Sequence, residues 1–215
     1  MMPPAHQWSY DMIKNIVFDI GNVLAAFCWR QYIEELGITG STAERLAAAT
    51  TQNPLWREVD RGVMSVDDII TAMIATDPEI EDVIRLFFRD RRRLVLEYDY
   101  SAGWLRELKS CGYRIYLLSN YSEDHFAYIR NHFKFFGLED GMVISYQEKC
   151  LKPEARIYNI LLDRYGLAAE ECVFLDDTPE NIEGARAVGM KGIVFTGYAE
   201  GRRMLEELLS EEGLK

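Results

Sequence analysis

The chain has 215 residues, of which 48% are hydrophobic and 27% charged, with a formal net charge of −11. This length and balance are typical of one substantial folded core with a small appendage. The negative charge repels nucleic acid and anionic lipid, and no apolar run of about 18 residues occurs, so we expect neither a nucleic-acid partner nor a membrane span.

The cysteines and the N-terminus suggest where the protein works. Four cysteines occur without a Cys-x-x-Cys spacing, which favours reduced thiols. The first residues, MMPPAHQWSYDM, have the pattern of a short tail rather than of a signal peptide. We therefore expect a cytoplasmic protein.

The first predicted strand leads directly to an acidic residue. Residues 14–23 have the sequence KNIVFDIGNV, in which an apolar run reaches Asp19 and the chain then turns through Ile20 and Gly21. Asp19 is therefore expected at the carboxyl end of a buried strand.

The segment that follows has helical spacing and no strand signal. Its apolar residues recur at helical intervals, and Ser41 and Ser65 are candidate N-caps. We predict that residues 29–95 form a helical cap inserted after the first strand. The remaining parts, 1–28 and 96–215, are predicted to form the core.

Strand and helix signals alternate from residue 100 onward. We predict helices over 101–110, about 122–136, 153–166, 179–189 and about 198–210, and strands over 113–118, 142–146, 172–177 and 190–196. This alternation requires right-handed crossovers and a mostly parallel sheet. The predicted fold class is therefore α/β, a Rossmann-like parallel sheet with helices on both faces plus a small all-helical cap.

Carboxylates stand at the ends of two predicted strands, as Asp19 and as the pair Asp176 and Asp177. Ligands of an open parallel sheet bind outside the carboxyl ends of its strands, so these residues should converge. Crowded carboxylates repel, and a Mg²⁺ ion relieves the repulsion by accepting carboxylates, a backbone carbonyl such as that of Gly21, and a substrate phosphate oxygen. Taken alone, Asp176 and Asp177 could instead cap the helix that follows.

Two further segments could bind an anion. Ser119 and Asn120 precede a predicted helix, where a hydroxyl and backbone N–H groups can form an anion site, although they could also be plain caps. Lys152 precedes the next predicted helix, and its ammonium could neutralise both a phosphate and the Asp19 carboxylate. A single lysine in such a place is otherwise a surface residue.

The four segments together resemble a known family. FDIGNV, LLSN, LKPEARIY and FLDDTPENIEGA, in this order, are similar to the motifs of haloacid dehalogenase-like hydrolases with a small helical cap. The resemblance implies that Asp19 attacks phosphorus to form an aspartyl-phosphate, which water then hydrolyses. It also implies that Ser119 and the Asn120 amide bind the phosphate and that Lys152 balances charge. The Mg²⁺ ligands that it implies are Asp177, Asp19, the Gly21 carbonyl and, by a second contact or through a water, Asp176.

Two positions depart from the family pattern. Most members carry Asp-x-Asp in the first motif, the second Asp being the general acid/base, whereas this chain has Gly21; Asn181 also stands where many relatives have an Asp. FD-x-GNV resembles a subgroup that includes bacterial α-D-glucose-1-phosphate phosphatases, and the stretch DRGVMSVDDI (60–69) is similar to their cap loop.

A missing general acid restricts the substrate. General acid catalysis contributes about 10²–10⁴-fold, so its loss favours anomeric, acyl or aryl phosphates, whose leaving oxygens are the more acidic. His125, in the first turn of the helix after Asn120, is the first candidate replacement, and the cap carboxylates Glu58 and Asp60 are the others.

The expected activity is that of a Mg²⁺-dependent phosphatase acting on a small phosphorylated metabolite, such as the sugar phosphate glucose-1-phosphate. One alternative is a degenerate protein of the same fold that binds a phospho-ligand or a partner without turnover. Retention of Asp19, Ser119, Lys152 and Asp177 argues against it. A 2-haloacid dehalogenase also lacks the second Asp, but it needs no metal, so the acidic pair at the fourth motif disfavours that alternative.

Overall fold

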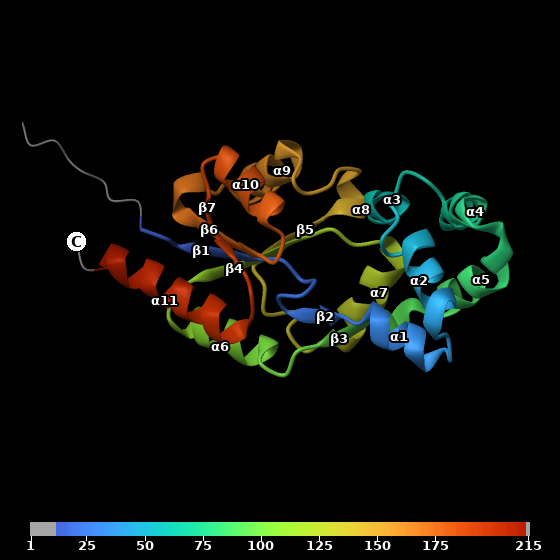
Figure 1. Ribbon diagram of the computed structural model, residues 1–215. Coiled ribbons are helices and arrows are strands. Elements are labelled where there is room, and N and C mark those ends of the chain that lie inside the picture. The colour runs from blue at the N-terminus through green and yellow to red at the C-terminus, as the bar shows by residue number, and fades with distance from the viewer. Residues whose placement is uncertain (1–11, 214–215) are drawn as a thin grey trace, which may run out of the picture.

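The computed structural model describes residues 12–213, and the side chains as far as residue 210. Residues 1–11, which make up all of the predicted N-terminal tail except Met12 and are also the first residues assigned to the core, therefore lie outside the described residues. At the centre is a five-stranded sheet with the order β5-β4-β1-β6-β7 (Figure 1). Every neighbouring pair in it is parallel. Its strands are β1 (Asn15–Phe18), β4 (Arg114–Ser119), β5 (Gly141–Ile144), β6 (Cys172–Asp176) and β7 (Lys191–Val194).

Helices cover both faces of this sheet, as predicted (Figure 1). One face is covered by α6 (Ser101–Ser110), α7 (Glu123–His132) and α11 (Tyr198–Gly213), and the other by α9 (Ala155–Tyr165) and α10 (Pro179–Ala187). Successive strand residues point to opposite faces, so Phe18 packs in the first of these cores and Val17 in the second. The strand is buried on both sides, which is why it is almost continuously apolar.

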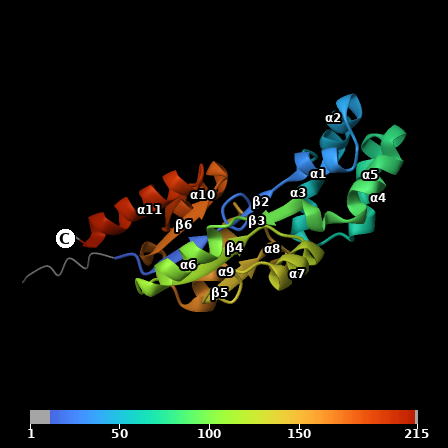
Figure 2. The ribbon, with the colours of Figure 1, turned by 90° about the horizontal axis from the view of Figure 1, so that it is seen from below.

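A second group of helices lies beyond the carboxyl ends of the strands (Figure 2). It comprises α1 (Trp29–Glu35), α2 (Gly40–Ala49), α3 (Leu55–Arg61), α4 (Val66–Thr76), α5 (Glu81–Arg89) and the short 3₁₀ turns Pro78–Ile80 and Arg91–Leu94. A separate apolar cluster around Leu46, Ile84 and Phe87 holds them together. We propose that this group is the cap predicted for residues 29–95.

An antiparallel ribbon joins the two groups, and the sequence analysis missed it. Strand β2 (Ala25–Phe27) pairs with β3 (Val95–Glu97). Strands of three residues are too short to establish the alternation of apolar and polar residues that is typical of a strand, so no sequence pattern predicts them. Helix α3, with seven residues, lies within the segment predicted to be helical.

Several predicted boundaries differ from the observed ones. Helix α7 ends at His132 rather than near 136, because Phe133 is extended (φ −89°, ψ 137°). Ser65 caps α4 by accepting a hydrogen bond from the Asp68 N–H (3.1 Å), as predicted. Ser41 instead lies in the first turn of α2, whose N-cap is Thr39. Among the described helices, none has the length and apolar character needed to cross a membrane.

Candidate active site

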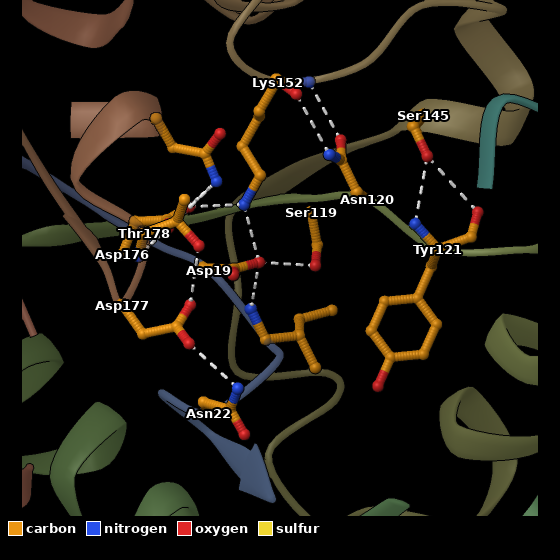
Figure 3. A network of polar contacts seen from close by, with 12 residues as sticks. Asp19, Asn22, Ser119, Asn120, Tyr121, Ser145, Lys152, Asp176, Asp177 and Thr178 are labelled. Atoms are coloured by element: carbon orange, nitrogen blue, oxygen red, sulfur yellow. Dashed lines mark hydrogen bonds and ion pairs between the residues drawn. The ribbon is translucent and has the colours of Figure 1, made fainter. Parts of the chain in front are cut away.

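The carboxyl ends of three adjacent strands bring the predicted residues together around Asp19 (Figure 3). One oxygen of this carboxylate, Oδ1, accepts hydrogen bonds from Ser119 Oγ (2.5 Å) and the Ile20 N–H (2.7 Å) and pairs with Lys152 Nζ (2.8 Å). No hydrogen bond from the described residues reaches the other oxygen, Oδ2. The carboxylate is thus held through one oxygen and leaves the other available to a ligand.

Lys152 is buried between two carboxylates. Its Nζ lies 2.8 Å from Asp19 Oδ1 and 2.6 Å from Asp176 Oδ2, and only 1% of the side chain is exposed. Burial alone would lower the pKa of Lys152, but the two carboxylates outweigh it and raise the pKa above its ordinary value. The residue is therefore a fixed ammonium ion at the centre of the site.

The side chain of Asn120 positions this lysine. Asn120 Oδ1 accepts a hydrogen bond from the Lys152 N–H (2.9 Å), and its Nδ2 donates one to the Lys152 carbonyl (3.2 Å). These two bonds join the loop after β4 to the third motif. The phosphate contact of the Asn120 amide remains a prediction.

Asp176 has no spare acceptor capacity. Its buried carboxylate accepts Lys152 Nζ, the Thr178 N–H (2.8 Å) and Asn181 Nδ2 (3.0 Å to each oxygen). A carboxylate used in this way fits the orientation of Lys152 better than direct metal ligation. Asn181, which departs from the family pattern, is one of the donors that fix it.

The carboxylates of Asp19, Asp176 and Asp177 lie close together, each with an oxygen within 4.8 Å of the others. Of the three, Asp19 and Asp177 are better suited than Asp176 to ligate a hard cation. The Gly21 carbonyl accepts no hydrogen bond from residues 12–213, and Gly21 lines the same cavity as Asp19 and Asp177. Burial raises the pKa of Asp19 to about 7, with Lys152 opposing and Asp176 adding to the rise. A divalent cation held by Asp19, Asp177 and the Gly21 carbonyl would restore the ionised form.

Asn22 is a residue of this site that the sequence analysis missed. Its Nδ2 donates to Asp177 Oδ2 (2.8 Å) and its Oδ1 accepts from the Phe27 N–H (3.1 Å). Its φ of 54° lies in the left-handed region, which asparagine tolerates better than most residues. The sequence signal that could have indicated this role is the asparagine directly after Gly21, because a turn with a positive φ at this position favours asparagine.

A cavity of about 180 Å³ opens above Asp19. The side nearest the sheet is formed by Asp19, Gly21, Asn22, Asn120, Tyr121, Asp177 and Thr178. The linking ribbon, the cap and helix α7 contribute Phe27, Val95, Trp56, Asp60 and His125. Its walls therefore combine apolar rings with a small number of titratable groups.

His125 lines this cavity, but its surroundings do not favour the predicted role of proton donor. Burial lowers the pKa of His125 to about 3, and Arg91 adds to the effect. Its Nε2 is buried and has no hydrogen-bond partner. An imidazole that is neutral at pH 7 can hydrogen-bond a ligand but cannot deliver a proton as imidazolium. Glu58, another candidate, pairs with Arg61 (3.1 Å) and does not line the cavity.

The neutral state of His125 predicts a pH-dependent stability. Between the folded pKa of about 3 and the ordinary value of 6.5, the unfolded chain binds a proton here and the folded chain does not. The free energy of unfolding should therefore fall by up to about 1.4 kcal/mol for each unit that the pH decreases in this range, relative to His125→Gln. Urea unfolding of both proteins at several pH values measures the difference. Parallel pH profiles would mean that His125 can be protonated in the folded state.

The candidate active site is therefore a buried Asp held by a lysine and a serine, beside two further carboxylates, at the strand ends of a Rossmann-like sheet. Residues 13–189 match the family model described as haloacid dehalogenase-like hydrolase. The chain belongs to this family.

Two curated relatives and one solved structure illustrate the range of the family. The sesquiterpene phosphatase astK of Aspergillus oryzae is 27% identical over 85% of this chain and 90% of its own length. The D-ribitol-5-phosphate phosphatase of Bacteroides thetaiotaomicron is 26% identical over 93% of this chain and 100% of its own. The crystal structure of a haloacid dehalogenase family enzyme from B. thetaiotaomicron has a TM-score of 0.69 at 18% identity, covering 90% of this chain and 98% of the other, which establishes the shared fold.

Proposed function

We propose that the protein is a Mg²⁺-dependent phosphatase that hydrolyses a small phosphorylated metabolite through an aspartyl-phosphate on Asp19. The observation that carries this proposal is the state of the Asp19 carboxylate. One of its oxygens is fixed by Ser119, Lys152 and the Ile20 N–H, whereas the other accepts no hydrogen bond from residues 12–213, and the carboxylate belongs to the acidic cluster with Asp176 and Asp177. Such an arrangement suits a positioned nucleophile.

Each residue has a defined part in the proposed reaction. Asp19 Oδ2 forms a bond to phosphorus while the bond from phosphorus to the ester oxygen breaks. The ammonium of Lys152 and the hydroxyl of Ser119 offset negative charge on the phosphoryl oxygens. Water then attacks phosphorus and releases phosphate from Asp19. A Mg²⁺ ion held by Asp19, Asp177 and the Gly21 carbonyl would supply further charge neutralisation.

The size of the cavity and the sequence of the first motif determine which substrate class we propose. A volume of about 180 Å³ is below the usual range of drug-sized pockets and suits a small molecule. Within that class we propose a sugar phosphate, with glucose-1-phosphate favoured because the FD-x-GNV motif resembles that of bacterial α-D-glucose-1-phosphate phosphatases. The names of the two curated relatives point to different substrates, a sesquiterpene compound and D-ribitol-5-phosphate. They therefore support phosphatase chemistry rather than one particular substrate. A magnesium complex of the structurally similar Bacteroides enzyme supports the proposed metal.

The test is a screen of phosphorylated metabolites and p-nitrophenyl phosphate, with Mg²⁺ and with a chelator. We expect activity with Mg²⁺ only.

Asp177→Ala should raise the Mg²⁺ concentration needed for half-maximal rate by about 10- to 100-fold or more. Asp176→Asn, which acts on Lys152, should lower kcat with a smaller change in the Mg²⁺ requirement. Full activity in chelator would overturn the metal site.

A further inference from the structure

The proposed reaction needs a proton donor, and the position where the family usually has one is open. A Cβ atom built on Gly21 would meet no heavy atom within 4 Å, and the residue lines the cavity above Asp19. Its φ is not in the left-handed region. The first motif therefore leaves room for a side chain that is not there, and the proton must come from another wall of the cavity.

Asp60 enters this cavity from the cap, on a helix that is fastened to the core. It lies near the carboxyl end of α3 and lines the same cavity as Asp19. Ser145 Oγ, in the short helix α8 (Ser145–Glu148), donates a hydrogen bond to the Asp60 carbonyl (2.6 Å). Two residues further along, Lys149 Nζ donates to the Gly62 carbonyl (2.6 Å). The backbone that carries the Asp60 side chain is thus fixed relative to the sheet.

The same serine connects Asp60 to the loop above the phosphate site. Ser145 Oγ accepts a hydrogen bond from the Tyr121 N–H (3.0 Å), and Tyr121 follows Asn120 directly (Figure 3). The backbone of Ser122 adds a hydrogen bond that favours the carboxylate form of Asp60. The cap carboxyl is therefore held against the loop that follows β4, in the cavity that Gly21 also lines.

The surroundings of Asp60 suit a group that both gives and accepts a proton. Burial raises its pKa to about 7, with Arg91 opposing and Asp19 adding to the rise, so both protonation states are accessible at neutral pH. The other candidates facing the cavity are less suitable. His125 is neutral, and burial raises the pKa of the Tyr121 phenol far above its ordinary value.

We propose that Asp60 is the general acid and base of this enzyme, a catalytic residue supplied by the cap in place of the missing one at Gly21. This inference rests on the proposed phosphatase function. As the bond between phosphorus and the leaving oxygen breaks, its electron pair goes to that oxygen, which takes the proton from the Asp60 carboxyl. The resulting carboxylate then removes a proton from the water that attacks the phosphoryl group on Asp19, so that Asp60 is protonated again when phosphate leaves.

The leaving group tests this assignment. We expect Asp60→Asn to lower kcat/KM for alkyl phosphates by about 10²–10⁴-fold. The loss for p-nitrophenyl phosphate should be less than about tenfold, because its leaving oxygen needs no proton. The dependence of kcat/KM on leaving-group acidity should therefore be steeper in the variant than in the wild type. The matched control Asp82→Asn, an exposed Asp on the cap helix α5, should leave the dependence unchanged.

A second substitution shows whether the lost function is proton transfer. Adding Gly21→Asp to Asp60→Asn should restore alkyl phosphate turnover by at least about tenfold with little change for p-nitrophenyl phosphate, since the new side chain has space at the family's usual position. A loss in Asp60→Asn that is equal for every leaving group, or no loss at all, would overturn the assignment. Absence of Mg²⁺-dependent activity in the wild type would instead contradict the proposed function.

Discussion

Replacing Asp19 with Asn is expected to lower kcat by about 10⁴-fold or more while the protein stays folded. An amide is too weak a nucleophile to form the phosphoenzyme. Its carbonyl oxygen can still accept the bonds that Ser119 and the Ile20 N–H donate to Asp19 Oδ1, so the site should keep its shape. Steady-state assays with p-nitrophenyl phosphate and saturating Mg²⁺ measure the loss.

The control for this substitution is Asp163→Asn on helix α9, where the Asp is exposed. It makes the same chemical change away from the cavity and should retain full activity. Circular dichroism and thermal unfolding should show that both variants are folded. Retention of a tenth of the wild-type rate by Asp19→Asn would exclude covalent catalysis at this residue.

Replacing Lys152 with Met should have the second large effect, on stability as well as on activity. The substitution removes the ammonium that lies between the Asp19 and Asp176 carboxylates. Loss of one partner from a buried ionic group typically costs about 3–5 kcal/mol, because the remaining charges are left uncompensated. We expect a decrease of this order in the free energy of unfolding, measured by urea denaturation at pH 8, together with loss of turnover.

A double-mutant cycle separates the charge effect from lost packing. The Lys152 ammonium also lies over the Phe174 ring, 5.2 Å from its centre, so part of the loss could come from that contact. Asp176→Asn removes one of the two stranded charges and keeps an oxygen for the Thr178 N–H. The double variant should therefore be less destabilised than the sum of the single variants. Strict additivity would contradict a charge-based account of this site.

The sheet and its helices were predictable because their signals are local and repeated. Apolar runs long enough to fill a buried strand lie in alternation with segments of helical spacing, and the helix predicted to end at 166 does so at Gly166, whose φ is 61°. The three-residue strands β2 and β3 have no such repetition. Their place is decided by packing between the cap and the core.

The candidate site also has parts that could be predicted from the sequence and parts that could not. Strand ends in a parallel sheet share one edge, so the sequence sufficed to predict that Asp19, Ser119 and Asp176 lie close together. It could not reveal that the oxygens of Asp176 accept hydrogen bonds from Lys152 and from the residues that follow Asp176. Nor could it reveal that Asn22 donates a hydrogen bond to Asp177. These contacts depend on side-chain directions across loops that are distant in the sequence. The contrast between His125 and Asp60 depends on burial in three dimensions, which no spacing encodes.

The most direct test of the central claim is a search for the phosphoryl group on Asp19 during the first turnover. Enzyme and substrate are mixed with Mg²⁺, quenched in acid at intervals shorter than one turnover, and digested for peptide mass spectrometry. We predict that the peptide containing Asp19 gains one phosphoryl group, which appears before free phosphate and then decays, and that Asp19→Asn gains none. Release of phosphate from the wild type with that peptide unmodified throughout the first turnover would contradict the covalent mechanism.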